Sequence, residues 1–300
     1  MSAYPSRSGD NGELREFLRT VRARLTPAEA GLAPSATVRR VPGLRREEVA
    51  QLAGVSVDYY VRLERGRQAN VSEAVLDSLA RALRLTDDER VHLYSLARPT
   101  RTRRPAALAP QRVRPAVYRI LDTLAETPAL VLGRRTDVLA ANELARALYV
   151  DFEALPRHDR NMARFTFLDP RARSLYANWQ AVGHAAVAAL RLYAGRHPHD
   201  PQLAELVGEL SLRDPDFRRW WAEHDVQRRT YGAKLFHHPV VGELRLDYEA
   251  LAVTGDDEQT LGIYTAEPAS PSAEALRLLA AWGAEQPLPG SLGTRAPRVV

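Results

Sequence analysis

Cysteine is absent from the 300 residues of the chain, which excludes disulfide bonds, thiol catalysis and thiolate zinc sites. No apolar run reaches the ~18 residues that a transmembrane helix needs, so we expect no membrane span. The first residues lack the apolar stretch of a secretory signal, and we expect a cytoplasmic protein. No GxSxG, P-loop or Rossmann glycine pattern occurs, so we expect neither an enzyme nor a bound metal or catalytic cofactor.

Lysine is almost missing as well, because 41 of the 42 basic residues are arginine and Lys234 is the single lysine. A GC-rich genome explains this bias, so arginine abundance alone does not indicate nucleic acid. The distribution of charge is more informative. Residues 1–114 carry 21 arginines and 13 acidic residues, a net charge of +8, whereas the remainder has a net charge of −3. A basic first third predicts that one end of the chain meets a polyanion.

The composition also divides the chain into segments. With 45% hydrophobic and 26% charged residues, it is typical of a globular protein with room for two domains. Residues 98–114 hold six arginines, no acidic residue and three prolines, and therefore predict an extended linker. We expect a helical domain over 1–97, a mixed domain over 115–285 and a disordered tail over 286–300.

Hydrophobic periodicity predicts five short helices in the first domain. They are expected over Leu14–Leu25, Arg45–Ala53 and Val57–Arg65, after a cap at Ser72, and after a capping box at Thr86–Glu89. Within them, Ala50 supplies the small residue where two helices of a helix-turn-helix cross, and Gly54 supplies a turn that tolerates positive φ. The apolar residues expected to hold the second helix against the core are Val55, Tyr60 and Leu63.

With its Leu-Glu-Arg-Gly ending and five-helix context, this pattern resembles the lambda-repressor-like (XRE) helix-turn-helix family over about residues 13–97. The resemblance implies binding of double-stranded DNA by a homodimer, since one such domain covers only a half-site. The DNA contacts expected are Arg46, Gln51, Ser56, Val57, Asp58, Tyr59, Arg62 and Arg67. Arg62 and Ser56 match base or phosphate contacts, Arg46 matches a phosphate contact, and Asp58 either accepts from a cytosine amino group or caps the helix.

The second domain mixes helix and strand signals. A helix over about Pro115–Glu126 precedes apolar segments at 129–132 and 138–141, which predict a β-hairpin. A helical block follows. Three strand signals then close the domain: Tyr231, Ala233 and Leu235 alternate with Gly232, Lys234 and Phe236; Leu244, Leu246 and Tyr248 alternate with polar residues; and Leu261 and Ile263 begin the last strand. The apolar parity shifts at Leu251 and Val253, which predicts a β-bulge.

Two strands, a helical block and three strands follow each other in a PAS-type sensor sheet. The segments V-P-G-L-R-R-E-E-V-A-Q-L-A-G-V-S, F-L-D-P-R-A-R, F-R-R-W-W-A-E-H-D-V and H-H-P-V-V-G-E-L resemble the MmyB-like family of actinobacterial transcription regulators over about residues 13–285. The resemblance implies an α+β protein, in which an all-α five-helix DNA-binding domain precedes a PAS-like antiparallel five-stranded sheet domain with a large helical insertion. It also implies a long-chain, fatty-acid-like ligand.

A cavity for such an amphiphile needs an apolar wall and one or two polar anchors. The wall candidates are Phe165, Phe167, Trp179, Trp220 and Trp221, and the anchor candidates are Asn161, Arg164 and His224. Each has a structural alternative: the aromatic residues as core, Arg164 as an ion-pair partner and Asn161 as a helix cap. Adjacent helical residues point apart, so at most one of Trp220 and Trp221 can line a pocket.

We therefore expect a dimeric, sequence-specific DNA-binding transcription regulator whose second domain senses a small hydrophobic ligand. The alternative is a DNA-binding regulator whose second domain only mediates dimerisation or docks a partner protein.

Overall fold

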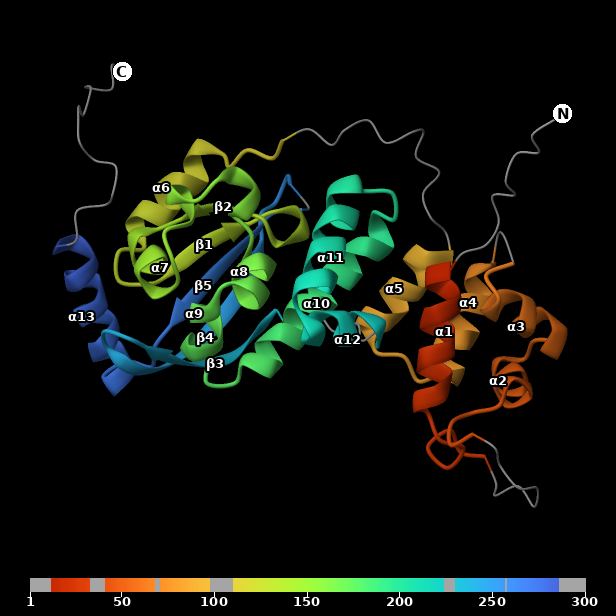
Figure 1. Cartoon of the computed structure of the whole chain (residues 1–300). Coiled ribbons are helices and arrows are strands. Elements are labelled where there is room, and N and C mark those ends of the chain that lie inside the picture. Colours follow the sequence, from red (N-terminus) through yellow and green to blue (C-terminus); the bar gives the residue numbers. More distant parts are fainter. Residues whose placement is uncertain are drawn as a thin grey trace, which may run out of the picture. The chain divides into compact units, whose positions relative to one another are not determined.

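The computed structural model describes residues 12–32, 41–67, 71–97, 110–223, 230–256 and 258–285, which form two compact units (Figure 1). The head unit spans 1–106, 188–206 and 218–228, and the sheet unit spans 107–187, 207–217 and 229–300. Most of the predicted linker, 98–109, and the predicted tail lie outside the described residues. In the ranges described, no helix is long and apolar enough to cross a membrane.

The amino-terminal part of the head unit is helical, as predicted. It contains α1 (Gly12–Arg24), α2 (Arg46–Ala53), α3 (Val57–Glu64), α4 (Glu73–Ala82) and α5 (Asp87–Ala97). The hydroxyl oxygens of Ser56 and Ser72 accept hydrogen bonds from backbone N–H groups of the helices they cap, and Thr86 and Glu89 form the expected capping box. Gly54 has a φ of 67° and ends α2 in the left-handed conformation, which confirms the predicted turn.

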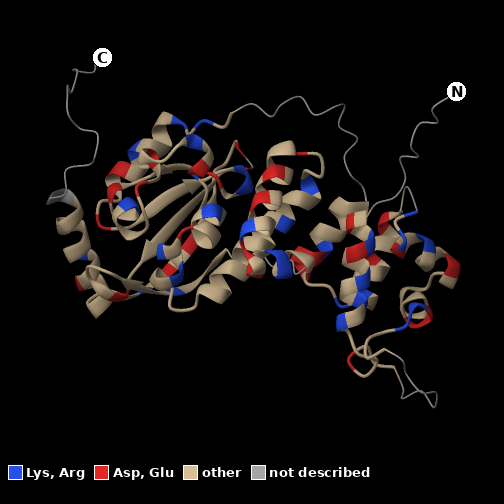
Figure 2. Cartoon of the chain, viewed as in Figure 1, with Lys and Arg blue, Asp and Glu red and all other residues tan. Residues whose placement is uncertain are grey.

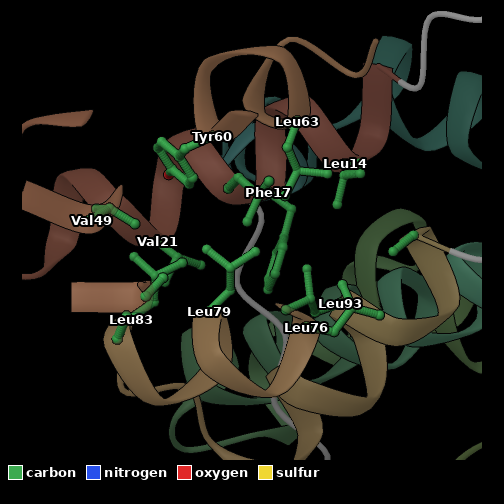
Figure 3. Close-up of a cluster of buried hydrophobic side chains, with 14 of the residues drawn as sticks. Leu14, Phe17, Val21, Val49, Tyr60, Leu63, Leu76, Leu79, Leu83 and Leu93 are labelled. Carbon is green, nitrogen blue, oxygen red and sulfur yellow. The ribbon is translucent and has the colours of Figure 1, made fainter. Parts of the chain in front are cut away.

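The apolar faces of these helices meet in one buried core (Figure 3). Phe17 of α1, Tyr60 of α3 and Leu79 of α4 point toward one another and are completely buried. The residues predicted to hold α3 against the core behave as expected, since Tyr60 and Leu63 are buried and Val55 packs at the edge. Burial of this apolar surface is the main force that holds the five helices together.

A buried carboxylate connects α1 with α2 and α3, the two helices of the helix-turn-helix. Glu64, the last residue of α3, accepts a hydrogen bond from the guanidinium group of Arg22 on α1 at 2.6 Å and another from Arg46 on α2. Arg22 also donates to the carbonyl oxygen of Leu44 at 2.7 Å. The hydroxyl of Tyr60 lies 3.5 Å from the same carboxylate, and burial together with this negative charge raises the pKa of Tyr60. The glutamate of Leu-Glu-Arg-Gly is thus a structural anchor.

The sheet unit contains a five-stranded antiparallel sheet in the order β2-β1-β5-β4-β3. Its strands are β1 (Ala129–Leu132), β2 (Val138–Ala141), β3 (Tyr231–His238), β4 (Gly242–Ala252) and β5 (Thr260–Thr265). Around them lie α6 (Pro115–Thr123), α7 (Glu143–Leu148), α8 (Met162–Leu168), α9 (Pro170–Leu175) and α13 (Pro271–Glu285), with short 3-10 helices over Arg134–Thr136, Phe152–Ala154 and Arg157–Asp159. The predicted α+β class, hairpin and three late strands are confirmed.

Alternation along the strands gives this sheet two different faces, because directly paired residues share a face. On one face, Val131 of β1 and Leu261 of β5 pack in a cluster with Val117 and Leu121 of α6. The opposite face carries buried side chains that include Phe236 of β3. Neither face of the sheet is therefore wholly solvent-exposed.

The predicted β-bulge at Leu251 and Val253 is wrong. Strand β4 keeps one register with β5 from Asp247 to Ala252. The apolar residues at this end of the strand lie on the other face of the sheet, because Val253 packs into the α6 cluster there. No inserted residue is needed for this change of face. The register irregularity of this sheet lies instead in the β1–β2 hairpin, between Val131 and Leu132.

Three helices contribute residues to both units: α10 (Trp179–Arg196), α11 (Pro201–Arg213) and α12 (Pro215–Ala222). Helix α10 passes from the sheet unit to the head unit between Val187 and Ala188. Inside the head unit, Leu192 joins the core formed by the amino-terminal helices. A Cβ atom at Gly195 would lie 2.5 Å from the ring of His92, so glycine is required for this close approach.

We expect Glu64→Gln to lower the free energy of unfolding by about 2–4 kcal/mol, because the guanidinium of Arg22, only 13% exposed, loses its negative partner. Urea denaturation followed by circular dichroism measures the change. The matched control is Glu47→Gln on α2, an exposed residue 4.0 Å from Arg45, where we expect less than about 1 kcal/mol. Equal losses for the two variants would contradict the anchoring role of Glu64.

Candidate functional sites

Four of the predicted DNA contacts, Ser56–Tyr59, lie at the amino-terminal end of α3. Arg46 begins α2, and Arg67 follows the carboxyl-terminal end of α3. Ser56, Val57 and Asp58 are exposed at the first turn of α3, and Arg62 is exposed one turn later. Residues four apart on a helix share a face, so Asp58 and Arg62 lie side by side on it. Tyr59 is half-buried against the core, and Gln51 of α2 is exposed. This arrangement suits insertion of α3 into a major groove.

These side chains differ in their existing bonds. The oxygen of Ser56 accepts a backbone N–H at 3.1 Å, and the guanidinium of Arg46 donates to the buried Glu64. The side chains of Arg62 and Arg67 make no hydrogen bond or ion pair with any other described residue, and both are exposed. Among the predicted DNA contacts, Arg62 and Arg67 are therefore the arginines that no described residue holds. The individual DNA contacts stay predictions.

Part of the positive charge of the head unit is neutralised internally. Figure 2 shows acidic residues interspersed among the basic ones on the head-unit helices. The buried Glu64 forms ion pairs with Arg22 and Arg46. The buried Glu89 forms an ion pair with Arg24 at 2.6 Å. Paired arginines contribute little to long-range attraction of a polyanion, so the unpaired exposed arginines supply most of it.

On the sheet unit, the face opposite α6 carries five aromatic rings that we call the aromatic cluster: Tyr149, Phe165, Tyr176, Phe236 and Tyr264. The ring centroid of Tyr149 lies 5.8 Å from those of Phe236 and Tyr264, 6.0 Å from that of Phe165 and 6.4 Å from that of Tyr176. The hydroxyl oxygen of Tyr149 is buried, and the hydroxyls of Tyr264 and Tyr176 are its hydrogen-bonding neighbours. The cluster is thus apolar except for its hydroxyl groups.

The hydroxyls of Tyr149 and Tyr176 remain protonated at neutral pH. Burial raises the pKa of Tyr149, and the neighbouring Tyr264 and Tyr176 raise it further. Burial likewise raises the pKa of Tyr176.

Lys234 of β3 lies beside this cluster. Its ammonium group donates a hydrogen bond to the hydroxyl oxygen of Tyr264 at 3.2 Å and lies 4.7 Å from the ring centroid of Tyr248. The side chain is half-buried, and it forms no ion pair with a carboxylate in the described part of the chain. Among the residues described, the sheet unit therefore places a positive charge without a carboxylate partner next to a tyrosine hydroxyl.

Of the predicted ligand contacts, only Phe165 belongs to the aromatic cluster. Phe167 and Trp179 pack edge to face at 5.7 Å, and the indole nitrogen of Trp179 donates to the carbonyl oxygen of Thr166 at 2.8 Å. Trp220 is buried and belongs to the head unit. His224 lies outside the described residues.

The two predicted polar anchors have structural partners. Asn161 is buried, caps α8 through its side-chain oxygen, and donates from its amide nitrogen to Asp137 at 2.8 Å. The guanidinium group of Arg164 donates to Glu209 at 2.8 Å. Both side chains thus adopt the cap and ion-pair alternatives foreseen for them, and their contact with a ligand stays a prediction.

Sequence reasoning did not select Tyr149, Tyr264 or Lys234 as binding residues. One signal was available in the alternation of β3. Tyr231 and Leu235, the larger residues of its apolar set, are 73% and 37% exposed, whereas the set that holds Lys234 faces the cluster. A lone lysine on the inward side of a strand, in a chain that otherwise uses arginine, marks an unusual position.

A helix-turn-helix with an open recognition face, joined to a separate antiparallel sheet domain, defines a two-domain DNA-binding transcription regulator. A model of the helix-turn-helix domain matches residues 13–93, and a model of the MmyB-like transcription regulator ligand binding domain matches residues 113–279. The second match covers more than half of the chain, which therefore belongs to the MmyB-like transcription regulators. Both matched families are of the regulator type. No curated protein compared with the chain gave a match.

We expect Arg62→Ala to weaken binding to an operator selected from random DNA by about 10- to 100-fold, and binding to a scrambled duplex much less, because base contacts carry specificity. Fluorescence anisotropy on both duplexes at one salt concentration measures this. Arg19→Ala, which removes the same charge from the exposed side of α1, is the control and should change both affinities little. Equal losses of Arg62→Ala on the two duplexes would show a phosphate contact instead.

Proposed function

We propose that this regulator is a homodimer that changes its affinity for a specific operator when a fatty-acid-like ligand occupies the sheet unit. The observation that carries the ligand part is the buried aromatic cluster around Tyr149, close to the charge of Lys234, in the part of the chain matched by the ligand binding domain. Ligand sites combine largely apolar walls with a few polar groups in this way.

The proposed dimer is supported by the small number of base pairs that one recognition helix can contact. One α3 covers a few base pairs of one major groove, and affinity and specificity of this class come from two half-sites about one helical turn apart. A homodimer presents the same face of α3 to both half-sites. Each copy would then supply its own exposed Arg62 and Gln51.

Coupling between ligand and DNA is supported by contacts that α10 makes inside the head unit. Arg191 is buried, donates to Glu13 of α1 at 2.9 Å, and stacks on the ring of Trp221 at 3.9 Å. Burial lowers the pKa of Arg191, and Glu13 opposes that effect, so the arginine stays charged. A displacement of α10 would therefore act on α1, which Arg22 ties to α3 through Glu64.

We expect saturating sodium tetradecanoate to change operator affinity by about 5- to 150-fold, the range of typical coupling free energies. Anisotropy titrations with and without the lipid measure the change, and native mass spectrometry of the same sample reports the dimer and the bound lipid. Bound lipid with operator affinity unchanged within about twofold would refute the switch. A dimer that binds no lipid would favour a second domain that only dimerises or docks a partner protein.

Arg191→Met should reduce the lipid-induced change in operator affinity towards unity, because it removes the charged contact between α10 and α1. Lipid affinity should stay within about threefold of the wild type, since Arg191 lies outside the aromatic cluster. Parallel lipid and operator titrations separate the two effects. The control, Arg213→Met, removes an arginine that is 59% exposed and pairs with Glu209, and should retain the full response. An unchanged response in Arg191→Met would exclude this route.

A further inference from the structure

We infer that the homodimer forms through the sheet unit, with α6 of each copy lying on the uncovered β3–β4 half of the other copy's sheet. The occupant of this surface is thus a second copy of the chain. The inference rests on the proposed homodimer and adds the surface through which the two copies meet. We call the uncovered surface the β3–β4 patch, and its residues are Tyr231, Ala233, Leu235, Asp247, Glu249 and Leu251.

The strand register places the β3–β4 patch on the same face of the sheet as α6. Leu251 of β4 pairs directly with Leu261 of β5, and Leu261 packs in the cluster with α6. Glu249 lies two residues before Leu251 and pairs with Tyr231 of β3, so both point to this face. The α6 cluster takes its strand residues from β1, β2 and β5, whereas every residue of the patch is exposed. In the described part of the chain, half of this face therefore lacks a covering helix.

The patch is more apolar than a solvated sheet face requires. An antiparallel strand that faces water on one side ordinarily carries polar residues there. The outward set of β3 holds Tyr231, Ala233 and Leu235 instead, and Tyr231 is 73% exposed. Leu251 is 46% exposed and lies diagonally across from Tyr231, a spacing that large side chains can bridge. Adjoining exposed apolar side chains of this kind mark an interaction surface.

Helix α6 carries matching apolar side chains. Val117 and Leu121 are buried against the sheet, whereas Tyr118 and Ile120 are 44% and 46% exposed. An amphipathic helix that covers one sheet normally has polar residues on its remaining surface. Two large apolar side chains on the exposed side of this nine-residue helix are therefore available to a second sheet.

The distribution of charge identifies the occupant as a second copy. Residues 112–122, which include most of α6, carry three arginines and one aspartate, a net charge of +2. The outward residues of β4 from 243 to 249 are three acidic residues and one arginine, a net charge of −2. Arg119 of α6 and Asp247 and Glu249 of β4 are exposed and form no ion pair among the described residues. A basic helix and an acidic strand that stay unpaired within one chain can pair between two chains.

The two contacts of such a dimer are equivalent. A twofold axis that places α6 of the first copy on the patch of the second repeats the contact in the other direction. Both unpartnered surfaces are thus covered in one closed dimer. The contact uses no residue of α2 or α3, so both recognition helices stay available to DNA.

The first test measures the dimer dissociation constant of the full-length protein by sedimentation equilibrium at low salt. Arg119→Glu and Glu249→Arg each place like charges across the contact, twice in the dimer, and should weaken dimerisation by at least about 10-fold. The double variant exchanges the two charges and should recover the wild-type constant within about threefold. The control is Glu205→Arg, the same reversal at an exposed residue of α11, which should change the constant less than about twofold.

The outcomes separate this contact from the proposed homodimer. A dimer that both single variants leave unchanged would keep the homodimer and overturn the contact. Weakening by the single variants without recovery in the double variant would also overturn it, because the two charges would not meet. A wild-type chain that stays monomeric at the highest concentration measured would refute the homodimer itself.

The absence of cysteine allows a second test that does not depend on charge. Ile120→Cys and Tyr231→Cys are prepared separately, mixed, left to exchange subunits and treated with a flexible bismaleimide. We expect mass spectrometry to show a covalent heterodimer, because the contact joins α6 of one copy to β3 of the other. The control mixture replaces Tyr231→Cys by Leu212→Cys, at an exposed residue of α11, and should give a several-fold lower yield. Equal yields from the two mixtures would overturn the contact.

Discussion

The strict alternation of side chains along the β-strands determines what the sheet unit can do. One set of residues packs against α6, and the other set builds the aromatic cluster. Lys234 faces that cluster only because β3 pairs it with Leu246, in register along the whole strand. A slip of one residue would turn the ammonium outward and bring Leu235 in its place. The strand register therefore determines which side chains reach this face of the sheet.

Buried charges play a comparable part in the head unit. Glu64 draws a guanidinium group from each of two other helices to the end of α3 and so sets how the recognition helix is held. Arg191 does the same for α10 and α1. Buried ion pairs add little net stability compared with apolar packing, but removing one partner is costly, so they specify one arrangement of helices. An arrangement held by such paired contacts can pass a small displacement from one helix to the next.

Local signals in the sequence were enough for the head unit. Its five helices were predicted from hydrophobic periodicity, the caps at Ser56 and Ser72 and the turn at Gly54. These signals could be found in the sequence because each involves residues close together in the chain. The site on the sheet was harder to predict. Tyr149 and Tyr264 are far apart in the sequence and meet only through the β1–β5 and β4–β5 pairings. The β-bulge was predicted wrongly for the same reason, because no pattern within β4 indicates that α6 covers the second face of the sheet.

The chain places its basic residues in two kinds of surroundings, which differ in solvent exposure. Arg62 and Arg67 stand in water, where their attraction to phosphate is weakened by salt and acts over about 10 Å or less. Lys234 is partly shielded from water by aromatic rings, where salt screens an ion pair far less. The charge of Lys234 is therefore less sensitive than the exposed arginines of the head unit to the salt concentrations that alter DNA binding.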